Sequence, residues 1–471
     1  MKVALVHPPL QNLLSAAVPE YVESNRGATP PMGLLYIQAA IENSQHESVL
    51  FDGALENWDH EETAKKIVEF APEVVGIQAM TFTLVDSIFV AKEIKKLNPN
   101  IAIVIGGPHP TIYPKETAEL ENVDYAFAGE GEERFIQFLD SFHQTEELRK
   151  IVGIAEKGRT HEYEPFGKFL KDMDKIPFPA RKSSQWKRYS SVLAKRNPIT
   201  IMISSRGCPY KCVFCNRMGR QYRFHSAEYV LKEFDEIVKL GIKEVFIHDD
   251  TFSIKRSRIV ELCNGLLERN YDIIWEARTR VDCVDEDLLK LMKKAGCERL
   301  SFGVESGSEK VLKKIQKGTE DLDLVRNTFK YCRQVGITTL ADFMVGNLDE
   351  EEQDIEDSIR FMKEINPDFV QFSICSPYPG TPLYEMGLKN GMFKKDIWLE
   401  FAKNPTPDFK SPVWTQNFST EELIAFSAKG YKTFYLRPAF IWKQLREIHS
   451  LKQFITLAKG AIGMILQKTK R

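Results

Sequence analysis

The chain has 471 residues, of which 43% are hydrophobic and 28% charged, and its formal net charge is −2. This length is too great for one ordinary hydrophobic core and predicts two or three domains. The small net charge argues against a nucleic acid as a general partner. The first residues lack the apolar run of a signal peptide, and no uninterrupted apolar stretch is long enough for a membrane-spanning helix. We therefore expect a globular protein of the cytoplasm.

Residues 1–145 alternate short apolar runs with helical patterns. The runs have the composition of strands and lie at residues 3–6, 48–51, 74–77, 101–105 and 123–127. Helical patterns separate them, at residues 33–42, 61–70, 84–96 and 131–142. This alternation predicts an α/β fold with a doubly wound parallel sheet, which is a Rossmann-like domain. Such a sheet binds its ligand beyond the carboxyl ends of its strands.

Small residues and glycines follow three of these predicted strands. The pairs are Met80 and Thr81, Gly106 and Gly107, and Gly129 and Glu130. Glycine allows the backbone to approach a bulky ligand closely. Ordinary turn chemistry explains the same glycines, so they do not identify a ligand by themselves.

Residues 146–195 are polar and mixed, and we interpret them as a linker between domains. From residue 196 to residue 400 a strand–helix cycle repeats six times, with strands predicted to end near residues 204, 248, 277, 304, 345 and 374. Ser226 and Asp285 are placed to cap two of the intervening helices. Six cycles predict a partial (βα)6 barrel, in which polar groups past the strand ends form the ligand site.

Three thiols stand on the loop that follows the first barrel strand. Cys208, Cys212 and Cys215 have the spacing C-x3-C-x2-C, and the other five cysteines have no ligand spacing. A structural zinc takes four protein ligands, and a disulfide is disfavoured in a reducing compartment. An iron–sulfur cubane with three protein thiolates leaves one iron open for another ligand. We favour a cluster site over three thiols that merely pack.

This motif, with Phe214 before its last cysteine, resembles the signature of the radical S-adenosylmethionine (SAM) enzymes. The resemblance implies a [4Fe–4S] cluster held by the three cysteines. It also implies that SAM binds the open iron and is split by one electron to methionine and a 5′-deoxyadenosyl radical. It identifies no catalytic side chain. The implied SAM contacts are the backbone after Phe214 for adenine, Asp249 and Asp250 for the amino group, Glu305 for the ribose, and Arg278 or Arg280 for the carboxylate.

The N-terminal segment resembles the cobalamin-binding domain that precedes many radical SAM domains. The similar stretches are GATPPMGLL at 27–35, GIQAMT at 76–81, GGPH at 106–109 and GEGE at 129–132. The resemblance implies that the six strand-end residues named above contact cobalamin. The D-x-H-x-x-G pattern of other cobalamin domains is replaced by HPPL at residues 7–10. We therefore expect base-off cobalamin with no protein histidine on the cobalt.

The combined resemblance implies methylation of an unactivated carbon, with SAM supplying both the radical and the methyl group. The family also contains oxidative cyclases and ring-remodelling enzymes, which the motifs do not separate from methyltransferases. A methylthiotransferase is a remote alternative because no cysteine precedes Cys208, and a non-enzymatic corrinoid or cluster carrier is another. We expect a small-molecule or lipid-like substrate and a reductant such as flavodoxin or ferredoxin.

Residues 401–471 form a predicted C-terminal extension. From Tyr431 onward the chain has nine lysines and arginines against one acid, Glu447, and its apolar residues recur at a helical period. A basic amphipathic helix of this kind binds a membrane surface or docks on its own domain with solvated lysines. The sequence leaves both alternatives open.

Overall fold

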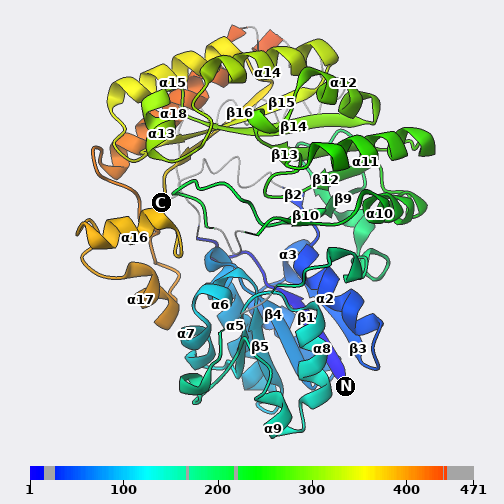
Figure 1. Ribbon diagram of the computed structural model, residues 1–471. Helices are drawn as coiled ribbons and strands as arrows, with labels where there is room; N and C mark the ends of the chain where they lie inside the picture. The colour runs from blue at the N-terminus through cyan, green and yellow to red at the C-terminus, as the bar shows by residue number, and fades with distance from the viewer. Residues whose placement is uncertain (15–26, 166–168, 217–220, 439, 443–471) are drawn as a thin grey trace. The chain divides into compact units, whose positions relative to one another are not determined.

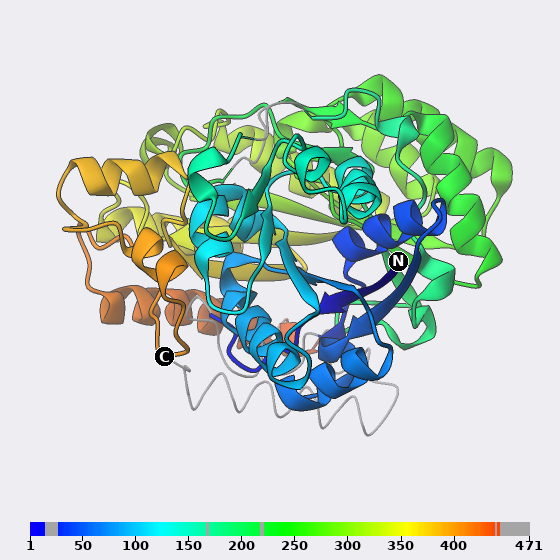
Figure 2. The ribbon, with the colours of Figure 1, turned by 90° about the horizontal axis from the view of Figure 1, so that it is seen from below.

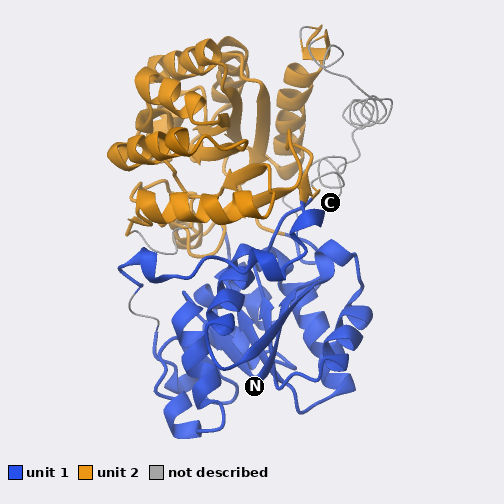
Figure 3. Ribbon diagram, turned by 90° about the vertical axis from the view of Figure 1, so that its right-hand side faces the viewer, with its two compact units in different colours: residues 1–15, 28–189, 393–410 blue, residues 16–27, 190–392, 411–471 orange. Residues whose placement is uncertain are grey.

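The computed structural model describes residues 1–14, 27–165, 169–216, 221–438 and 440–442. The chain forms two compact units, which Figure 3 shows in blue and orange. Unit 1 comprises residues 1–15, 28–189 and 393–410, and unit 2 comprises residues 16–27, 190–392 and 411–471. Each unit contains its own sheet.

Unit 1 is built on a sheet of order β3-β1-β4-β5-β6-β7. Its strands are β1 (Lys2–His7), β3 (Glu47–Asp52), β4 (Val74–Gln78), β5 (Ala102–Gly106), β6 (Tyr125–Phe127) and β7 (Ile154–Glu156). All neighbouring strands are parallel except β6 and β7. The chain moves from β1 to β3 on one side and then returns to β4 on the other. The doubly wound sheet predicted from the sequence is therefore confirmed, with its switch point at β1.

Helices cover this sheet, as Figures 1 and 2 show. The longer ones are α2 (Met32–Glu42), α4 (His60–Glu69), α5 (Leu84–Leu97) and α8 (Glu132–Ser141); the shorter ones are α3 (Gly53–Glu56), α6 (Pro108–Ile112), α7 (Pro114–Glu119) and α9 (Thr145–Leu148). Helix α17 (Ile397–Lys403) packs on α7. Helices α2 and α8 pack together, and α4 packs on α5. Val3 and Leu5 of β1 enter one core cluster with Phe135 and Phe138 of α8, which ties the sheet to that helix layer.

Unit 2 contains six parallel strands in the order β16-β15-β14-β13-β12-β9. They are β9 (Ile199–Met202), β12 (Glu244–Ile247), β13 (Ile274–Thr279), β14 (Cys297–Glu305), β15 (Thr338–Val345) and β16 (Phe369–Ile374). Spatial neighbours are also neighbours in the strand series of the chain, as in a (βα) barrel. The predicted partial (βα)6 barrel is confirmed.

Most helices of unit 2 pack on one another in series beside this sheet. They are α10 (Ala227–Lys239), α11 (Arg256–Arg269), α12 (Glu286–Lys294), α13 (Glu309–Lys314), α14 (Leu322–Val335), α15 (Glu352–Ile365), α16 (Pro382–Lys389) and α18 (Thr420–Tyr435). Ser226 and Asp285 cap α10 and α12 through their side chains, as predicted. Hydrophobic spacing and cap residues together set these helix boundaries.

Three domain boundaries differ from those expected. The boundary at 145 is too early, because β7 adds an antiparallel strand to the sheet of unit 1. The segment expected as a linker belongs to unit 1 up to residue 189, and residues 393–410 belong to that unit as well. The extension expected to begin at residue 401 contributes α18 to the barrel unit, where it packs on β16. A single strand or helix added to a domain does not extend the repeating strand–helix pattern, so the sequence does not show which domain it joins.

No helix in the described part of the chain is long and apolar enough to cross a membrane. The basic amphipathic helix predicted near the C-terminus falls mainly on residues 443–471, which lie outside the described residues.

The edge strand β16 is capped by the hydroxyl group of Tyr435. This hydroxyl accepts a hydrogen bond from the Val370 N–H (3.1 Å) and donates one to the Val370 carbonyl oxygen (2.8 Å). One side chain thus satisfies both backbone groups of a residue on the open edge of the sheet, where unpaired groups invite pairing with another chain.

We expect Tyr435→Phe to lower the free energy of unfolding by about 1–3 kcal/mol, because two part-buried backbone groups lose their partner. Urea denaturation followed by tryptophan fluorescence measures the change. Tyr331→Phe is the control, since the Tyr331 hydroxyl makes no hydrogen bond among the described residues. Equal stability of the Tyr435 variant and the native protein would show that the cap contributes nothing.

Candidate active site

The cysteine loop leaves the barrel sheet just after β9. A short strand, β10 (Ser205–Arg206), pairs with β11 (Arg223–Phe224), and the three cysteines stand between them. Cys208 is partly exposed, Cys212 is buried, Cys215 is exposed, and all three are free thiols. The loop therefore offers three reduced sulfur atoms at the carboxyl end of the first barrel strand, as the sequence predicted.

Backbone hydrogen bonds hold the middle of this loop. The Val213 N–H donates to the Ile315 carbonyl oxygen (3.0 Å), and the Val213 carbonyl oxygen accepts from the Leu383 N–H (2.9 Å). The Asn216 amide donates to the Pro379 carbonyl oxygen (2.7 Å). The stretch that contains Phe214 and Cys215 is thus tied to the segment that follows β16.

Tyr210, between the first two cysteines, is clamped from two sides. Its hydroxyl oxygen lies 3.0 Å from the Cys283 sulfur, and the Arg280 guanidinium lies 3.6 Å from its ring centroid. Two hydrogen bonds of 2.8 Å join Arg280 to the Asp282 carboxylate. Arg280 is therefore engaged with protein groups, whereas the Arg278 side chain on β13 is exposed. Of the two arginines, Arg278 is better placed to pair with the SAM carboxylate, which stays a prediction.

The Cys212 thiol is buried, and two positively charged side chains lie near it. Burial raises the pKa of the Cys212 thiol, while the positive charges of Lys317 and Arg280 oppose that rise. The thiolate is the form that binds metal. The described residues contain no three His, Cys, Asp or Glu side chains already arranged to hold a metal ion. The donor set fits an iron–sulfur cluster, and the sulfur atoms have to converge when the cluster is loaded.

Asp249, predicted to contact SAM, is buried beneath the start of the loop. Its carboxylate accepts hydrogen bonds from the N–H and hydroxyl groups of Ser204 (2.6 and 2.6 Å) and of Ser205 (2.9 and 2.7 Å). Burial raises the pKa of Asp249, and Arg258 and the two serines oppose it. The structure thus gives Asp249 a structural role that the sequence did not reveal. Its neighbour Asp250 is exposed and interacts with the Gly207 N–H. The SAM contacts of both acids stay predictions.

Glu305 ends β14 with its backbone in the left-handed region, at a φ of 67°. Its Oε1 atom accepts a hydrogen bond from Lys317 (2.8 Å), and both side chains are largely buried. Gly303 makes room for this ion pair, because a Cβ atom there would lie 2.8 Å from the Lys317 Nζ and would also collide with the Glu305 Oε1. The Glu305 Oε2 has no partner among the described residues, so it is available for a hydroxyl donor such as a ribose.

Asp342 and His248 are two titratable residues of the barrel that were not predicted from the sequence as site residues. Asp342 lies on β15 directly opposite Gly303 of β14. Burial, reinforced by the charge of Glu305, raises the pKa of Asp342 to about 7, against the opposing charges of Arg278 and Lys317. Burial and Arg278 lower the pKa of His248 to about 4. The sequence feature that could have indicated Asp342 is its position as a single acid in the apolar strand around residues 340–345. No sequence feature indicated that Lys317 would pair with Glu305.

We expect Asp342→Asn to raise the free energy of unfolding of the apo protein at pH 8 by roughly 2–4 kcal/mol. The folded-state pKa of about 7 is higher than that of the unfolded chain, so the folded state binds the extra proton between the two values and native stability falls as pH rises from about 4 to about 7. Denaturant unfolding at pH 5 and pH 8 tests this. The variant should gain relative to the native protein at pH 8 and much less at pH 5; an identical offset at both values would contradict it.

In unit 1, hydrogen bonds join the predicted cobalamin-contact loops at the carboxyl edge of the sheet. The Ala79 N–H donates to the Gly106 carbonyl oxygen (2.8 Å), and the Gly129 N–H donates to the Thr111 hydroxyl oxygen (2.8 Å). Gly107 has a φ of 115°, and a Cβ atom there would lie 2.9 Å from the Ala79 carbonyl oxygen. Glycine is thus required where these two loops approach each other.

The remaining residues predicted to contact cobalamin belong to the same loops. The Met80 N–H donates to the Thr83 hydroxyl oxygen (3.0 Å), and the Glu130 carboxylate accepts from the Leu170 N–H (3.2 Å). The structure therefore brings the three predicted pairs to one edge of the sheet as braced, largely small-residue loops. This is the edge at which a doubly wound sheet binds its ligand, and the individual cobalamin contacts stay predictions.

His109 lies under these loops and is fully buried. Its Nδ1 atom is 3.3 Å from the Thr81 hydroxyl oxygen, and its Nε2 atom has no hydrogen-bond partner. Burial lowers the pKa of His109 to about 3, so the imidazole is neutral when the protein is folded. The folded protein therefore resists protonation at a site next to the predicted Thr81 contact.

We expect native stability to fall by about 2 kcal/mol between pH 7 and pH 5 through His109 alone, because only the unfolded chain takes up the proton below pH 6.5. Chemical denaturation of the native protein and of His109→Phe at both pH values measures this. The variant, which cannot titrate there, should lose about 2 kcal/mol less than the native protein. A parallel loss in both proteins would contradict the assignment.

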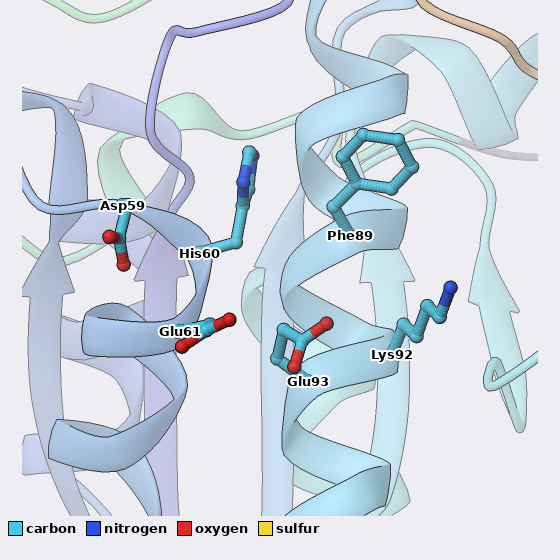
Figure 4. A pocket seen from close by; sticks show the side chains of 6 residues that line it. All are labelled: Asp59, His60, Glu61, Phe89, Lys92 and Glu93. Carbon is cyan, nitrogen blue, oxygen red and sulfur yellow. The ribbon is translucent and has the colours of Figure 1, made fainter.

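A pocket of about 320 Å³ lies between α4 and α5 of unit 1 (Figure 4). It is lined by Asp59, His60, Glu61, Phe89, Lys92 and Glu93. None of the predicted site residues lines it, and its walls carry both signs of charge. We assign it no role in the candidate active site.

Two family models match the chain in the order that the sequence suggested. The B12 binding domain matches residues 21–139, and the radical SAM superfamily matches residues 202–362. The chain is 33% identical over 461 residues to an uncharacterized methyltransferase of Pyrococcus horikoshii, which covers 95% of both chains. It is 27% identical to the anaerobic magnesium-protoporphyrin IX monomethyl ester cyclase of Rubrivivax gelatinosus, over 88% of this chain and 75% of that one.

Solved structures share the fold. The cobalamin-dependent SAM radical enzyme OxsB, with aqua-cobalamin and SAM bound, has a TM-score of 0.74 at 17% identity, over 99% of this chain and 72% of that one. The methyltransferase TsrM from Kitasatospora setae, with cobalamin and a [4Fe–4S] cluster bound, has a TM-score of 0.67 at 17% identity, over 83% and 78%.

The fold and the cysteine loop thus define a radical SAM enzyme with a cobalamin-binding domain. The chain belongs to the family of cobalamin-binding radical SAM enzymes. Its cofactors are a [4Fe–4S] cluster, SAM and cobalamin, as the resemblance of its motifs implied. Because this family consists of enzymes, the non-enzymatic carrier considered from the sequence is set aside.

Proposed function

We propose that the protein transfers a methyl group to an unactivated carbon of a small-molecule or lipid-like substrate. The observation that carries the proposal is the full-length similarity to a relative named as a methyltransferase. A cytidylyl-2-hydroxyethylphosphonate methyltransferase of Streptomyces wedmorensis, 26% identical over 77% of this chain and 78% of that one, supports the same reaction class. When bound, the cluster supplies the electron that splits SAM, and cobalamin supplies the methyl group.

The side chains of the barrel bind and orient SAM in this reaction. Arg278 pairs with the SAM carboxylate through its exposed guanidinium, and the uncommitted Oε2 of Glu305 accepts from the ribose hydroxyls. Lys317 holds Glu305 in place and, with Arg280, adds positive charge near Cys212. An unactivated C–H bond has neither a leaving group nor an acidic proton, so no side chain acts as its acid or base.

Several features of the setting belong to the same proposal. Cobalamin binds base-off, the electron comes from a small reductant protein of the flavodoxin or ferredoxin type, and the reaction takes place in the cytoplasm. Three pairs of residues contact cobalamin: Met80 and Thr81, Gly106 and Gly107, and Gly129 and Glu130. The braced loops that carry these residues support this part of the proposal.

The cyclase relatives favour a second candidate, which is oxidative cyclisation or ring remodelling without methyl transfer. The Rubrivivax gelatinosus cyclase matches 88% of this chain, although at lower identity than the methyltransferase relative. Both candidates begin with the same cleavage of SAM, so they differ only in the fate of the methyl group.

We expect the anaerobically reconstituted, reduced protein to release 5′-deoxyadenosine from SAM, and Cys212→Ala to lower that rate by at least about 100-fold because the cluster loses a ligand. Chromatography of the nucleoside product measures the rate. Cys332→Ala, which removes a buried thiol far along the chain on α14, should stay within about twofold of the native protein. Equal rates in the native and Cys212 proteins would refute the cluster assignment.

The same assay, run with methyl-labelled SAM and an extract of small molecules and lipids from the producing cells, separates the two candidates. Methyl transfer places the label in an organic product. A product that forms with 5′-deoxyadenosine but without label would establish the second candidate instead.

A further inference from the structure

Strands β15 and β16 carry polar side chains on the inner face of the barrel sheet. Phe343 and Phe372 stack with their ring centroids 5.2 Å apart, and Tyr431 of α18 packs against Phe372, so these rings mark the face that the helices cover. Side chains alternate between the two faces along a strand, so Asp342 and Gln371 lie on the opposite, inner face. The strand register pairs these two residues directly, which places their side chains next to each other.

The protein itself does not use these two side chains. The Asp342 carboxylate and the Gln371 amide have no hydrogen-bond or ion-pair partner among the described residues, and both are at least partly exposed. Ser373, on the same face of β16, is also partly exposed, and its hydroxyl makes no hydrogen bond in the described part of the chain. Polar groups inside a domain are normally satisfied, so three adjacent ones that are accessible and unused indicate a place for a ligand.

The positive charges near Asp342 are committed elsewhere. Lys317 is paired with Glu305 at 2.8 Å, and Arg278 is assigned to the SAM carboxylate in the proposed reaction. Burial and the charge of Glu305 raise the pKa of Asp342 to about 7 although both cations oppose that rise. Such an acid lowers the stability of the empty protein at neutral pH, which is typical of a residue that serves a ligand rather than the fold.

The strand order separates this group of side chains from the predicted SAM contacts. Asp250, Arg278 and Glu305 lie at the ends of β12, β13 and β14, whereas β15 and β16 form the other side of the sheet. The cluster loop reaches that side as well, because Val213 and Asn216 are hydrogen-bonded to the segment that follows β16. A ligand on the inner face of β15 and β16 therefore occupies the side of the barrel that SAM leaves free, within the span of the cluster loop.

We propose that Asp342 and Gln371 bind the substrate and recognise a hydrogen-bond donor on it, which is a hydroxyl or an amino group. A carboxylate accepts a hydrogen bond from such a donor, and the neighbouring amide can accept or donate a second one. A phosphate or carboxylate of the substrate would be repelled at this place by the charges of Asp342 and Glu305. This inference names a substrate class for the proposed function, and it rests on hydrogen abstraction from a substrate carbon, which both candidate reactions share.

Deuterium transfer from the substrate to 5′-deoxyadenosine tests the proposal. The reconstituted and chemically reduced full chain receives unlabelled SAM and an extract of small molecules and lipids from the producing cells, grown in fully deuterated medium. When the 5′-deoxyadenosyl radical takes a deuterium atom, the C–D bond of the substrate breaks and the nucleoside keeps the deuterium at C5′, whether or not a methyl group follows. Mass spectrometry measures this nucleoside and separates it from the fully deuterated product of any SAM in the extract.

We expect Asp342→Asn to lower the rate of deuterium transfer by about 10–100-fold at limiting extract, and Gln371→Leu by about 3–10-fold, because each variant loses a hydrogen bond to the substrate. More extract should restore part of both rates, which a distorted barrel would not allow. Asp287→Asn is the matched control, since it removes an exposed acid from α12 on the helix side of the same unit, and it should stay within about twofold of the native protein.

A native rate in Asp342→Asn, or a loss that added extract does not restore, would overturn the proposal. A native protein that takes no deuterium from the extract would overturn it as well. Treating the extract with a reagent that acetylates amines identifies the donor: transfer that is then lost indicates an amino group, and transfer that is kept indicates a hydroxyl. Methyl transfer is not needed for any of these readouts, so a failure of the proposed methylation would appear separately, as deuterated nucleoside without a methylated product.

Discussion

The cysteine loop depends on one buried carboxylate. Asp249, at the end of the second barrel strand, gathers four hydrogen bonds from the two serines where the first strand ends. Each of those donors would otherwise be buried without a partner, at a cost of about 1–3 kcal/mol apiece. The carboxylate therefore sets the point at which the chain turns out of the sheet, and the three thiols take their positions from that turn.

The two units satisfy the polar groups at their binding edges in different ways. A binding edge needs polar groups, but polar groups near a core must be satisfied. In the barrel unit, fixed charges compensate one another: Lys317 holds Glu305, and Asp282 holds Arg280. In the Rossmann-like unit, glycines and backbone hydrogen bonds shape the edge, and the buried carboxylate of Asp52, at the end of β3, is satisfied by His7 and Tyr189. The first arrangement suits a charged ligand such as SAM, and the second suits a large, mostly neutral macrocycle.

Strand positions, two helix caps and the location of the cysteine loop could be predicted from the sequence, because each depends on neighbouring residues. The apolar runs ended within a few residues of the observed strands, and Ser226 and Asp285 were recognised from their position before helical patterns. Lys317, Asp342 and β7 could not be predicted in this way. Their roles arise from residues far apart in the chain, and only the assembled sheet brings Asp342 beside Gly303. The structural role of Asp249 was hidden for the same reason, since its partners precede it by more than forty residues.

Gly303 shows how a residue can shape a site without touching any ligand. Its lack of a side chain leaves the volume that the buried ion pair occupies. A methyl group there would displace the ends of the lysine and glutamate side chains, which are largely buried and have little room to move. Tolerance to substitution at this position should therefore follow side-chain volume rather than polarity, although the residue meets no ligand.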